Sequence, residues 1–239
     1  MKGKLLVIDG TDGSGKHTQT VALIKRLKKS GRKVATLDFP QYYKNFFGAL
    51  VGKYLAGDFG DPTKISPYLA SVLFAADRFE SGGKIRDWLH KGYIVVLDRY
   101  VSANQIHQGA KIRDAKMRRE FLTWLDKMEF GVFALPRPDA IIYLHVDPEI
   151  AHQLVAKKAA RAYTKGKTHD GHEGNLAFQR ASERQSLKLV QSMNNWQKIE
   201  CVERGNAKRS HGHAERGGQM LPPDQIAEKV WMEVEKIIR

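Results

Sequence analysis

KLLVIDGTDGSGKHT, residues 4–18, joins a short apolar run to a glycine-rich loop and the first turn of a helix. The run over residues 5–8 has the length of a strand buried in a parallel sheet. Glycines recur at positions 10, 13 and 15, and apolar side chains then return at helical spacing between Thr18 and Leu27. The pattern predicts a strand, a tight loop and a helix in direct succession.

This succession is the context in which phosphate-binding loops occur. Glycines let backbone N–H groups turn toward phosphate oxygens, and the positive end of the helix adds to the attraction. A lysine at this spacing supplies a point charge to the β- and γ-phosphates. We therefore expect the nucleotide phosphates to contact Gly10, Gly13, Ser14, Gly15, Lys16, His17 and Thr18. The alternative, a glycine-rich turn that binds nothing, does not explain the lysine.

The loop departs from its motif at one position. Gly-x4-Gly-Lys is normally followed by Ser or Thr, whose hydroxyl contacts Mg²⁺, but His17 stands there. Either Thr18 takes over this contact, or carboxylates and water hold the ion.

Composition limits the possible partners and compartments. Lys and Arg number 40 against 26 Asp and Glu, a net charge of +14, which favours polyanions such as nucleotides, nucleic acid or a membrane surface. Cys201 is the only cysteine, so an intrachain disulfide is excluded and a reducing compartment is favoured. No apolar run has the length of a signal peptide or a membrane span. We expect a soluble cytoplasmic protein.

The rest of the chain alternates between strand-like and helix-like segments. Further strands are predicted at residues 33–38, 93–97 and 140–146, with a weaker fifth at 198–202; helices are predicted at 66–89, 117–128 and from 222 onward. Such alternation indicates βαβ crossovers. We expect one α/β domain over residues 1–239, a P-loop NTPase-type parallel sheet of about five strands flanked by helices on both faces.

The long helix at 66–89 has an expected buried side and an expected weak point. Its spacing assigns the buried side to Leu69, Val72, Leu73, Ala76, Ile85 and Trp88. Gly82 and Gly83 predict a kink or an interruption.

Two polar segments stand apart from this pattern. Residues 157–173 carry five Lys or Arg side chains and are predicted to be either a catalytic lid over the γ-phosphate or a solvated surface loop. Residues 204–218 are interpreted as an inert insertion, with nucleic-acid or base contact as the alternative. His211 and His213 in this second segment lack further metal ligands, so we expect no metal there.

Four motifs in order along the chain resemble the thymidylate kinase family of P-loop nucleoside monophosphate kinases. They are the glycine loop followed by Thr18-Gln19, Asp38-Phe39-Pro40, LFAADRFE at 73–80 and DRYVSAN at 98–104. The loop alone is shared by many NTPases, whereas the helix motif together with Asp98-Arg99-Tyr100 is much more specific. The resemblance covers residues 4–178 and is compatible with the last strand and helix.

The resemblance assigns roles to residues on the acceptor side. It implies that Asp12 contacts the sugar 3′-hydroxyl, Phe74 stacks on thymine and Arg78 hydrogen-bonds the base. It also implies that Arg99 clamps the acceptor phosphate. The full implied substrate-binding set is Asp12, Phe39, Phe74, Arg78, Arg99, Ala103, Asn104 and His107. Core packing is the alternative for Phe74, and a purely structural ion pair is the alternative for Asp98 with Arg99.

Metal and transition-state roles follow from the same resemblance. Asp98 and Thr18 are the implied Mg²⁺ contacts, and Lys16, Asp12, Arg99 and a lid cation are the implied catalytic groups. Gly13 occupies the place of a catalytic arginine found in one subgroup, which moves that role to Lys157, Lys158 or Arg161. We choose Arg161, because a guanidinium bridges two phosphate oxygens. Residues 170–173 resemble an acidic motif at the end of the lid in some members.

The implied reaction is transfer of the ATP γ-phosphoryl group to dTMP with Mg²⁺, in a homodimer formed through the helix after Ser66. The alternatives are a nucleic-acid-binding P-loop protein, a kinase for another nucleoside or nucleotide, and a pseudoenzyme. The departures at His17 and at Tyr42, the latter in place of an arginine common in the family, leave the last alternative open. The resemblance implies ATP and dTMP as partners, and no membrane is expected. Aromatic residues are not interleaved with basic ones as nucleic-acid tracts require, so nucleic acid is not the expected partner, although the net charge of +14 does not exclude it.

Overall fold

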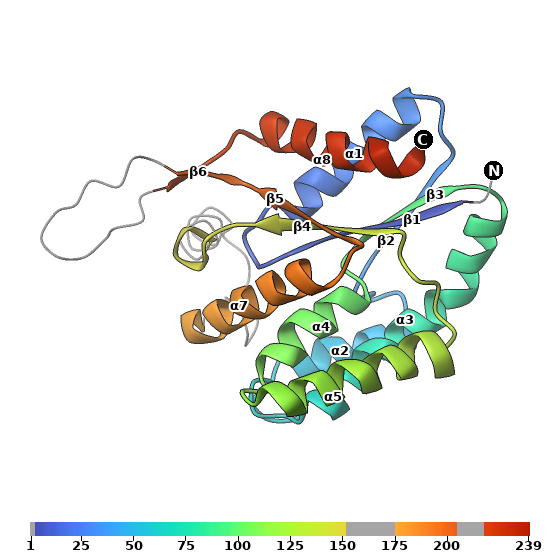
Figure 1. Ribbon diagram of the computed structural model, residues 1–239. Coiled ribbons are helices and arrows are strands. Elements are labelled where there is room, and N and C mark those ends of the chain that lie inside the picture. The colour runs from blue at the N-terminus through green and yellow to red at the C-terminus, as the bar shows by residue number, and fades with distance from the viewer. Residues whose placement is uncertain (1–2, 152–174, 205–217) are drawn as a thin grey trace, which may run out of the picture.

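A parallel sheet forms the centre of the protein. The computed structural model describes residues 3–151, 175–204 and 218–239. Five strands lie in the order β2-β3-β1-β4-β5, and every neighbouring pair is parallel (Figure 1). Their bounds are β1 Lys4–Gly10, β2 Val34–Asp38, β3 Ile94–Asp98, β4 Ala140–His145 and β5 Trp196–Glu200. The predicted sheet of five parallel strands is confirmed.

Helices cover both faces of this sheet (Figure 1). One layer consists of α1 (Lys16–Lys29) and α8 (Pro223–Ile238); the other includes α3 (Pro67–His90), α4 (Val101–Ala110) and α7 (Leu176–Ser192). Leu6 and Ile8 of β1 pack into the α1/α8 core, while Leu5 and Val7 pack into the opposite one. Because both faces of β1 are buried, its sequence is continuously apolar.

Two further helices lie outside the α3/α4 layer, where α2 (Phe46–Leu55) packs on α3 and α5 (Ala115–Asp126) packs on α4. Asp114 caps α5 by accepting a hydrogen bond from the Met117 N–H at 2.8 Å. The chain continues from α5 into a π-helix, η1 (Lys127–Val132), so the predicted helix at 117–128 is confirmed with a different last turn. Within the described residues, no helix is both long and apolar enough to cross a membrane.

The predicted fifth strand at 198–202 is placed two residues too late. β5 ends at Glu200, and Val202 belongs instead to an antiparallel pair of short strands, β6 (Val202–Arg204) and β7 (Gly218–Met220). Cys201 and Val202 are apolar, so the apolar pattern in the sequence continues beyond Glu200, where β5 ends. Residues 205–217, with most of the predicted insertion and both of its histidines, lie outside the described residues.

Helix α3 differs from its prediction in two ways. It runs without interruption through Gly82 and Gly83. Leu69 and Val72, predicted to be buried, are 69% and 42% exposed. The buried side is instead partly polar, with Ser71, Asp77, Arg78 and Ser81 below 9% exposure, because polar partners from other elements meet it there.

Candidate active site

The glycine loop lies at the carboxyl edge of the sheet, between β1 and α1. Gly13 and Gly15 adopt left-handed backbone angles, with φ of 82° and 84°, which glycine adopts without strain. A side chain at Gly10 would place its Cβ 2.5 Å from Ser14 Oγ and 2.7 Å from the carbonyl oxygen of Leu144. This edge is where parallel α/β sheets bind their ligands.

Lys16 folds back over this loop. Its Nζ donates to the carbonyl oxygen of Thr11 at 3.0 Å and lies 3.6 Å from Asp12 Oδ1. Burial lowers the pKa of Lys16, and the repulsion from Arg99 lowers it further, while Asp12 acts in the opposite direction. The next two side chains, His17 and Thr18, are exposed.

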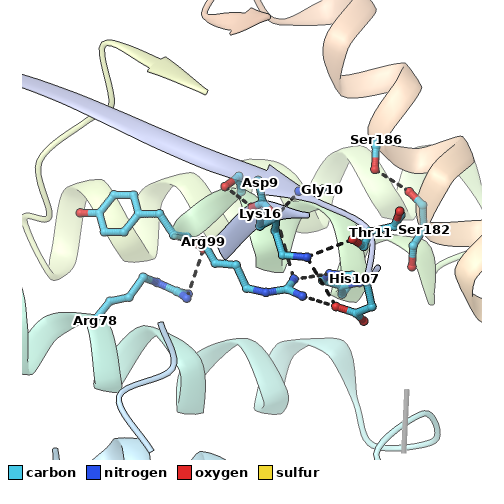
Figure 2. Close-up of polar contacts among 12 residues, drawn as sticks. Asp9, Gly10, Thr11, Lys16, Arg78, Arg99, His107, Ser182 and Ser186 are labelled. Carbon is cyan, nitrogen blue, oxygen red and sulfur yellow. Dashed lines mark hydrogen bonds and ion pairs between the residues drawn. The ribbon is translucent and has the colours of Figure 1, made fainter. Parts of the chain in front are cut away.

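Arg99 and His107 lie beside the loop (Figure 2), and Asp12 completes a polar cluster with them. The Arg99 guanidinium donates to the Asp12 carboxylate and, at 3.0 Å, to His107 Nε2. Burial alone would raise the pKa of Asp12, but Arg99 and Lys16 overcome it and hold this pKa well below its usual range. The Asp12 carboxylate is therefore charged at neutral pH and acts as a hydrogen-bond acceptor.

Arg99 is held in place by its backbone as well. Its φ of 64° is in the left-handed region, which a non-glycine residue rarely adopts, and its N–H donates to the Ile8 carbonyl at 2.9 Å. Such backbone outliers cluster at functional sites, where surrounding structure holds a side chain in a defined position.

A cavity of about 140 Å³ opens next to this cluster. Every predicted substrate-binding residue lines it. The complete lining is Asp12, Phe39, Pro40, Tyr42, Leu55, Phe74, Arg78, Arg99, Tyr100, Ala103, Asn104, His107 and Gln108. One end is charged and touches the glycine loop, whereas the other is aromatic with amide groups. This arrangement suits a flat ring attached to an anionic group.

The aromatic end of the cavity contains Phe74, whose ring meets that of Tyr54 edge to face at a centroid distance of 5.7 Å. Phe39, which follows β2, and Asn104 from α4 also line the cavity. Tyr100 contributes its backbone carbonyl, which accepts a hydrogen bond from Arg78 at 3.4 Å.

The sequence analysis missed two buried carboxylates at the site. Asp9 is the last residue but one of β1, is fully buried, and accepts hydrogen bonds from Ser102 Oγ at 2.5 Å and the Gly10 N–H at 2.8 Å. Glu129 in η1 is also fully buried and pairs with the Arg78 guanidinium at 2.8 and 2.5 Å. The position of Asp9 at the end of an apolar strand was an available signal. For Glu129 the sequence offered none, since its partner is 51 residues away.

The segment after β2 is tied to α3 through another carboxylate. Asp77 accepts from the Gln41 N–H at 3.1 Å and from Asn45 Nδ2 at 3.1 Å. The preceding Phe39–Pro40 peptide bond is cis. These contacts fix the segment that carries Phe39, Pro40 and Tyr42 into the cavity wall.

Asp98 and Thr18, the predicted Mg²⁺ contacts, both carry oxygen atoms near the loop. Burial raises the pKa of Asp98 and Lys16 partly opposes this, and its carboxylate accepts no hydrogen bond from the described residues. Within the described residues, no group of three or more His, Cys, Asp or Glu side chains is arranged to hold a metal. Carboxylate and hydroxyl oxygens fit Mg²⁺, which proteins hold with one or two carboxylates plus substrate phosphates.

A second cleft, of about 620 Å³, lies on the other side of the loop. Gly15 and Thr18 form one wall, and β7 with the segment before α8 forms the other. Gln19 at the base is 2% exposed and donates to the carbonyl oxygen of Pro223 at 2.9 Å. The glycine loop thus separates two spaces, each large enough to hold part of a ligand.

Comparison with known proteins decides the family. The thymidylate kinase family model matches residues 8–206. The chain belongs to the thymidylate kinase family. It is 33% identical over 176 residues to thymidylate kinase of Mycobacterium tuberculosis, covering 73% of this chain and 80% of that protein. The human thymidylate kinase is 28% identical over 201 residues, covering 84% and 83%.

The fold agrees with this assignment. Thymidylate kinase from Candida albicans superposes with a TM-score of 0.71, covering 100% of this chain and 94% of that one, at 24% sequence identity. The resemblance to the thymidylate kinase family in the four sequence motifs is confirmed. The individual roles of the site residues stay predictions, and the lid cations Lys157, Lys158 and Arg161 lie outside the described residues.

Proposed function

We propose that this member of the thymidylate kinase family transfers the ATP γ-phosphoryl group to the 5′-phosphate of dTMP, giving dTDP and ADP. The observation that carries the proposal is the cavity beside the glycine loop, charged at the loop and aromatic at its far end. The family assignment supports the same reaction. Residues 1–239 act as one kinase domain in this proposal.

The far end of the cavity takes the thymine base. Phe74 offers a ring face for stacking, an interaction that contributes about 1–3 kcal/mol per base. Arg78 donates a hydrogen bond to the base and Asn104 contacts it through its amide. Phe39 and Ala103 close the sides of the cavity, so that a flat ring fits between them.

The charged end of the cavity takes the sugar and the acceptor phosphate. Arg99 binds the phosphate, since a guanidinium matches two of its oxygens. Asp12 accepts a hydrogen bond from the sugar 3′-hydroxyl, which its lowered pKa permits at neutral pH. His107, held by Arg99 at 3.0 Å, lies beside the sugar and screens against a 2′-hydroxyl.

The glycine loop takes the ATP phosphates. Backbone N–H groups of the loop surround them, and Lys16 turns from Thr11 and Asp12 toward the β- and γ-phosphates. The attacking oxygen of dTMP is already ionised, so the reaction needs alignment and charge neutralisation rather than a strong general base. In this proposal Arg161 supplies the transition-state cation.

A magnesium ion accompanies ATP in the proposed reaction. When bound, it neutralises charge on the β- and γ-phosphates. Asp98 and Thr18 would hold it, directly or through water. His17, at the position where the motif has a hydroxyl, is exposed and leaves the neighbouring Thr18 to supply that oxygen.

The proposed assembly is a homodimer through α3. Leu69 and Phe79 on this helix are 69% and 51% exposed, and Val72 between them is 42% exposed. An apolar face of this kind on a long helix is typical of a surface that a protein partner covers. Sedimentation of the wild type and of Leu69→Glu tests the proposal, with a monomeric wild type as the contrary result.

The test of the proposed function is ADP production from Mg·ATP with each nucleoside monophosphate in turn, at matched concentrations. Turnover with dTMP well above dCMP, dGMP and UMP is expected. If no monophosphate stimulates ADP production, the chain is not a nucleoside monophosphate kinase and the proposal fails.

A further inference from the structure

A buried carboxylate lies behind the wall of the cavity that faces the base. Glu129 is 0% exposed and lies in the π-helix η1. Such π-helical turns are rare in proteins, and those that occur are often found at functional sites. It contacts two residues that line the cavity: Arg78, at 2.8 and 2.5 Å, and Asn104, at 3.2 Å. Glu129 does not line the cavity itself, so it acts on a ligand only through these two neighbours.

The first neighbour, Arg78, is fixed in one plane. Its Nε and one terminal nitrogen both donate to the Glu129 carboxylate, and its other terminal nitrogen donates to the Tyr100 carbonyl oxygen. These bonds use three of the five guanidinium N–H groups. A guanidinium has no acceptor, so whatever meets the remaining N–H groups at the cavity must be an acceptor atom.

The second neighbour, Asn104, has only one stable orientation of its amide. Its Nδ2 donates to the Ser71 carbonyl oxygen and to Glu129 Oε1, both at 3.2 Å, which uses both N–H groups. Turning the amide over would bring Oδ1 against these two oxygen acceptors. Because Oδ1 accepts no hydrogen bond from the described residues, Asn104 presents an acceptor to the cavity.

Arg78 and Asn104 together present a hydrogen-bond donor beside a hydrogen-bond acceptor to a ligand in the cavity. The Watson–Crick edge of thymine and uracil has the complementary pattern, an O4 acceptor beside an N3–H donor. Cytosine reverses both groups, with a 4-amino donor beside an unprotonated N3. A cytosine ring in this cavity would place donor against donor and acceptor against acceptor, each leaving a buried polar group unpaired.

We propose that Glu129 is a positioning residue that sets the selection of thymine over cytosine by holding Arg78 as a donor and Asn104 as an acceptor. The inference rests on the proposed function, in which this cavity takes dTMP. Arg78 is a donor in any arrangement, so the carboxylate decides the pattern through Asn104: without Glu129, only the Ser71 carbonyl oxygen opposes turning the amide over to present a donor.

The test is Glu129→Gln, which keeps the shape and gives residue 129 both a donor and an acceptor. We measure kcat/KM and the dissociation constants for dTMP, dUMP and dCMP. The dTMP-to-dCMP ratio is expected to fall about tenfold, through a higher KM for dTMP and tighter binding of dCMP. The dTMP-to-dUMP ratio should stay unchanged, because these two bases share the same edge and differ only in the 5-methyl group.

Two further variants make the result decisive. Asp139→Asn removes a carboxylate that holds Lys4 and the Leu5 N–H at the opposite edge of the sheet, and it should leave both ratios at the wild-type value. Where Glu129→Gln does not fold, Glu129→Asp retains the charge but is one methylene too short to reach both partners, so its dTMP-to-dCMP ratio should still fall.

Three outcomes would contradict the inference or its basis. A parallel loss of kcat/KM for all three nucleotides, with both ratios unchanged, would make Glu129 a structural residue and overturn the inference alone. A change in the dTMP-to-dUMP ratio of the same size would also overturn it. A wild type that does not phosphorylate dTMP would overturn the proposed function, and the inference with it.

Discussion

Replacing Arg99 by lysine keeps the positive charge but removes the planar guanidinium, whose two terminal nitrogens donate in parallel. In the structure one terminal nitrogen of Arg99 donates to Asp12 and the other donates to His107, so each retains one N–H for the acceptor phosphate. A lysine ammonium has three N–H groups, so one that keeps both the Asp12 and the His107 bonds reaches the phosphate with one fewer hydrogen bond. Hydrogen bonds to charged groups contribute about 1.5–3 kcal/mol.

Loss of one such bond in the transition state lowers kcat/KM for dTMP about 10–100-fold. Initial rates at saturating Mg·ATP measure this directly. Arg137→Lys is the matched control and should leave kcat/KM unchanged. Both terminal nitrogens of Arg137 also donate to a carboxylate, that of Asp126, at 2.7 Å, but the Arg137 side chain is 63% exposed on the surface. If Arg99→Lys retains the wild-type kcat/KM, Arg99 does not bind the acceptor phosphate and the reasoning is refuted.

Three other substitutions test the site and the fold. Phe74→Ala should raise KM for dTMP about 5–100-fold if the ring stacks on the base, whereas lower stability with unchanged KM would assign it to the core. Asp114→Ala removes the cap of α5 and should lower the free energy of unfolding by about 1 kcal/mol in denaturant titrations, with activity retained. His145 is partly buried, which lowers its pKa, but its hydrogen bonds to Glu183 and Glu200 outweigh this effect and raise it. The protonated form therefore stabilises the fold, so the stability lost in His145→Gln should be largest below about pH 6.5 and shrink as pH rises through the raised pKa. A loss that does not vary with pH would contradict this.

The sheet and the glycine loop were predictable because their signals are local. Strands buried on both faces must be continuously apolar, as β1 and β3 are, and the loop requires glycine wherever φ is positive. The eight predicted substrate-binding residues, all of which line the cavity, followed from the resemblance to the thymidylate kinase family, together with the rule that strand ends meet at one edge.

Helix α4 was missed for a physical reason. Its buried residues include Ser102, Asn104, Gln105 and Gln108, so the sequence has no apolar period to reveal it. These polar side chains are buried because partners from other elements meet them, as when Asp9 accepts from Ser102. The prediction that Leu69 and Val72 of α3 are buried was wrong. The buried face of that helix carries Arg78, which pairs with Glu129, and hydrophobic periodicity assigns a charged residue of this kind to the surface.

The glycine loop lies between two spaces that have no described lining residue in common: the cavity touches it at Asp12, and the wide cleft touches it at Gly15 and Thr18. A nucleotide entering one space therefore does not obstruct the other. The two substrates are expected to bind in random order, with each apparent KM little affected by the concentration of the other substrate.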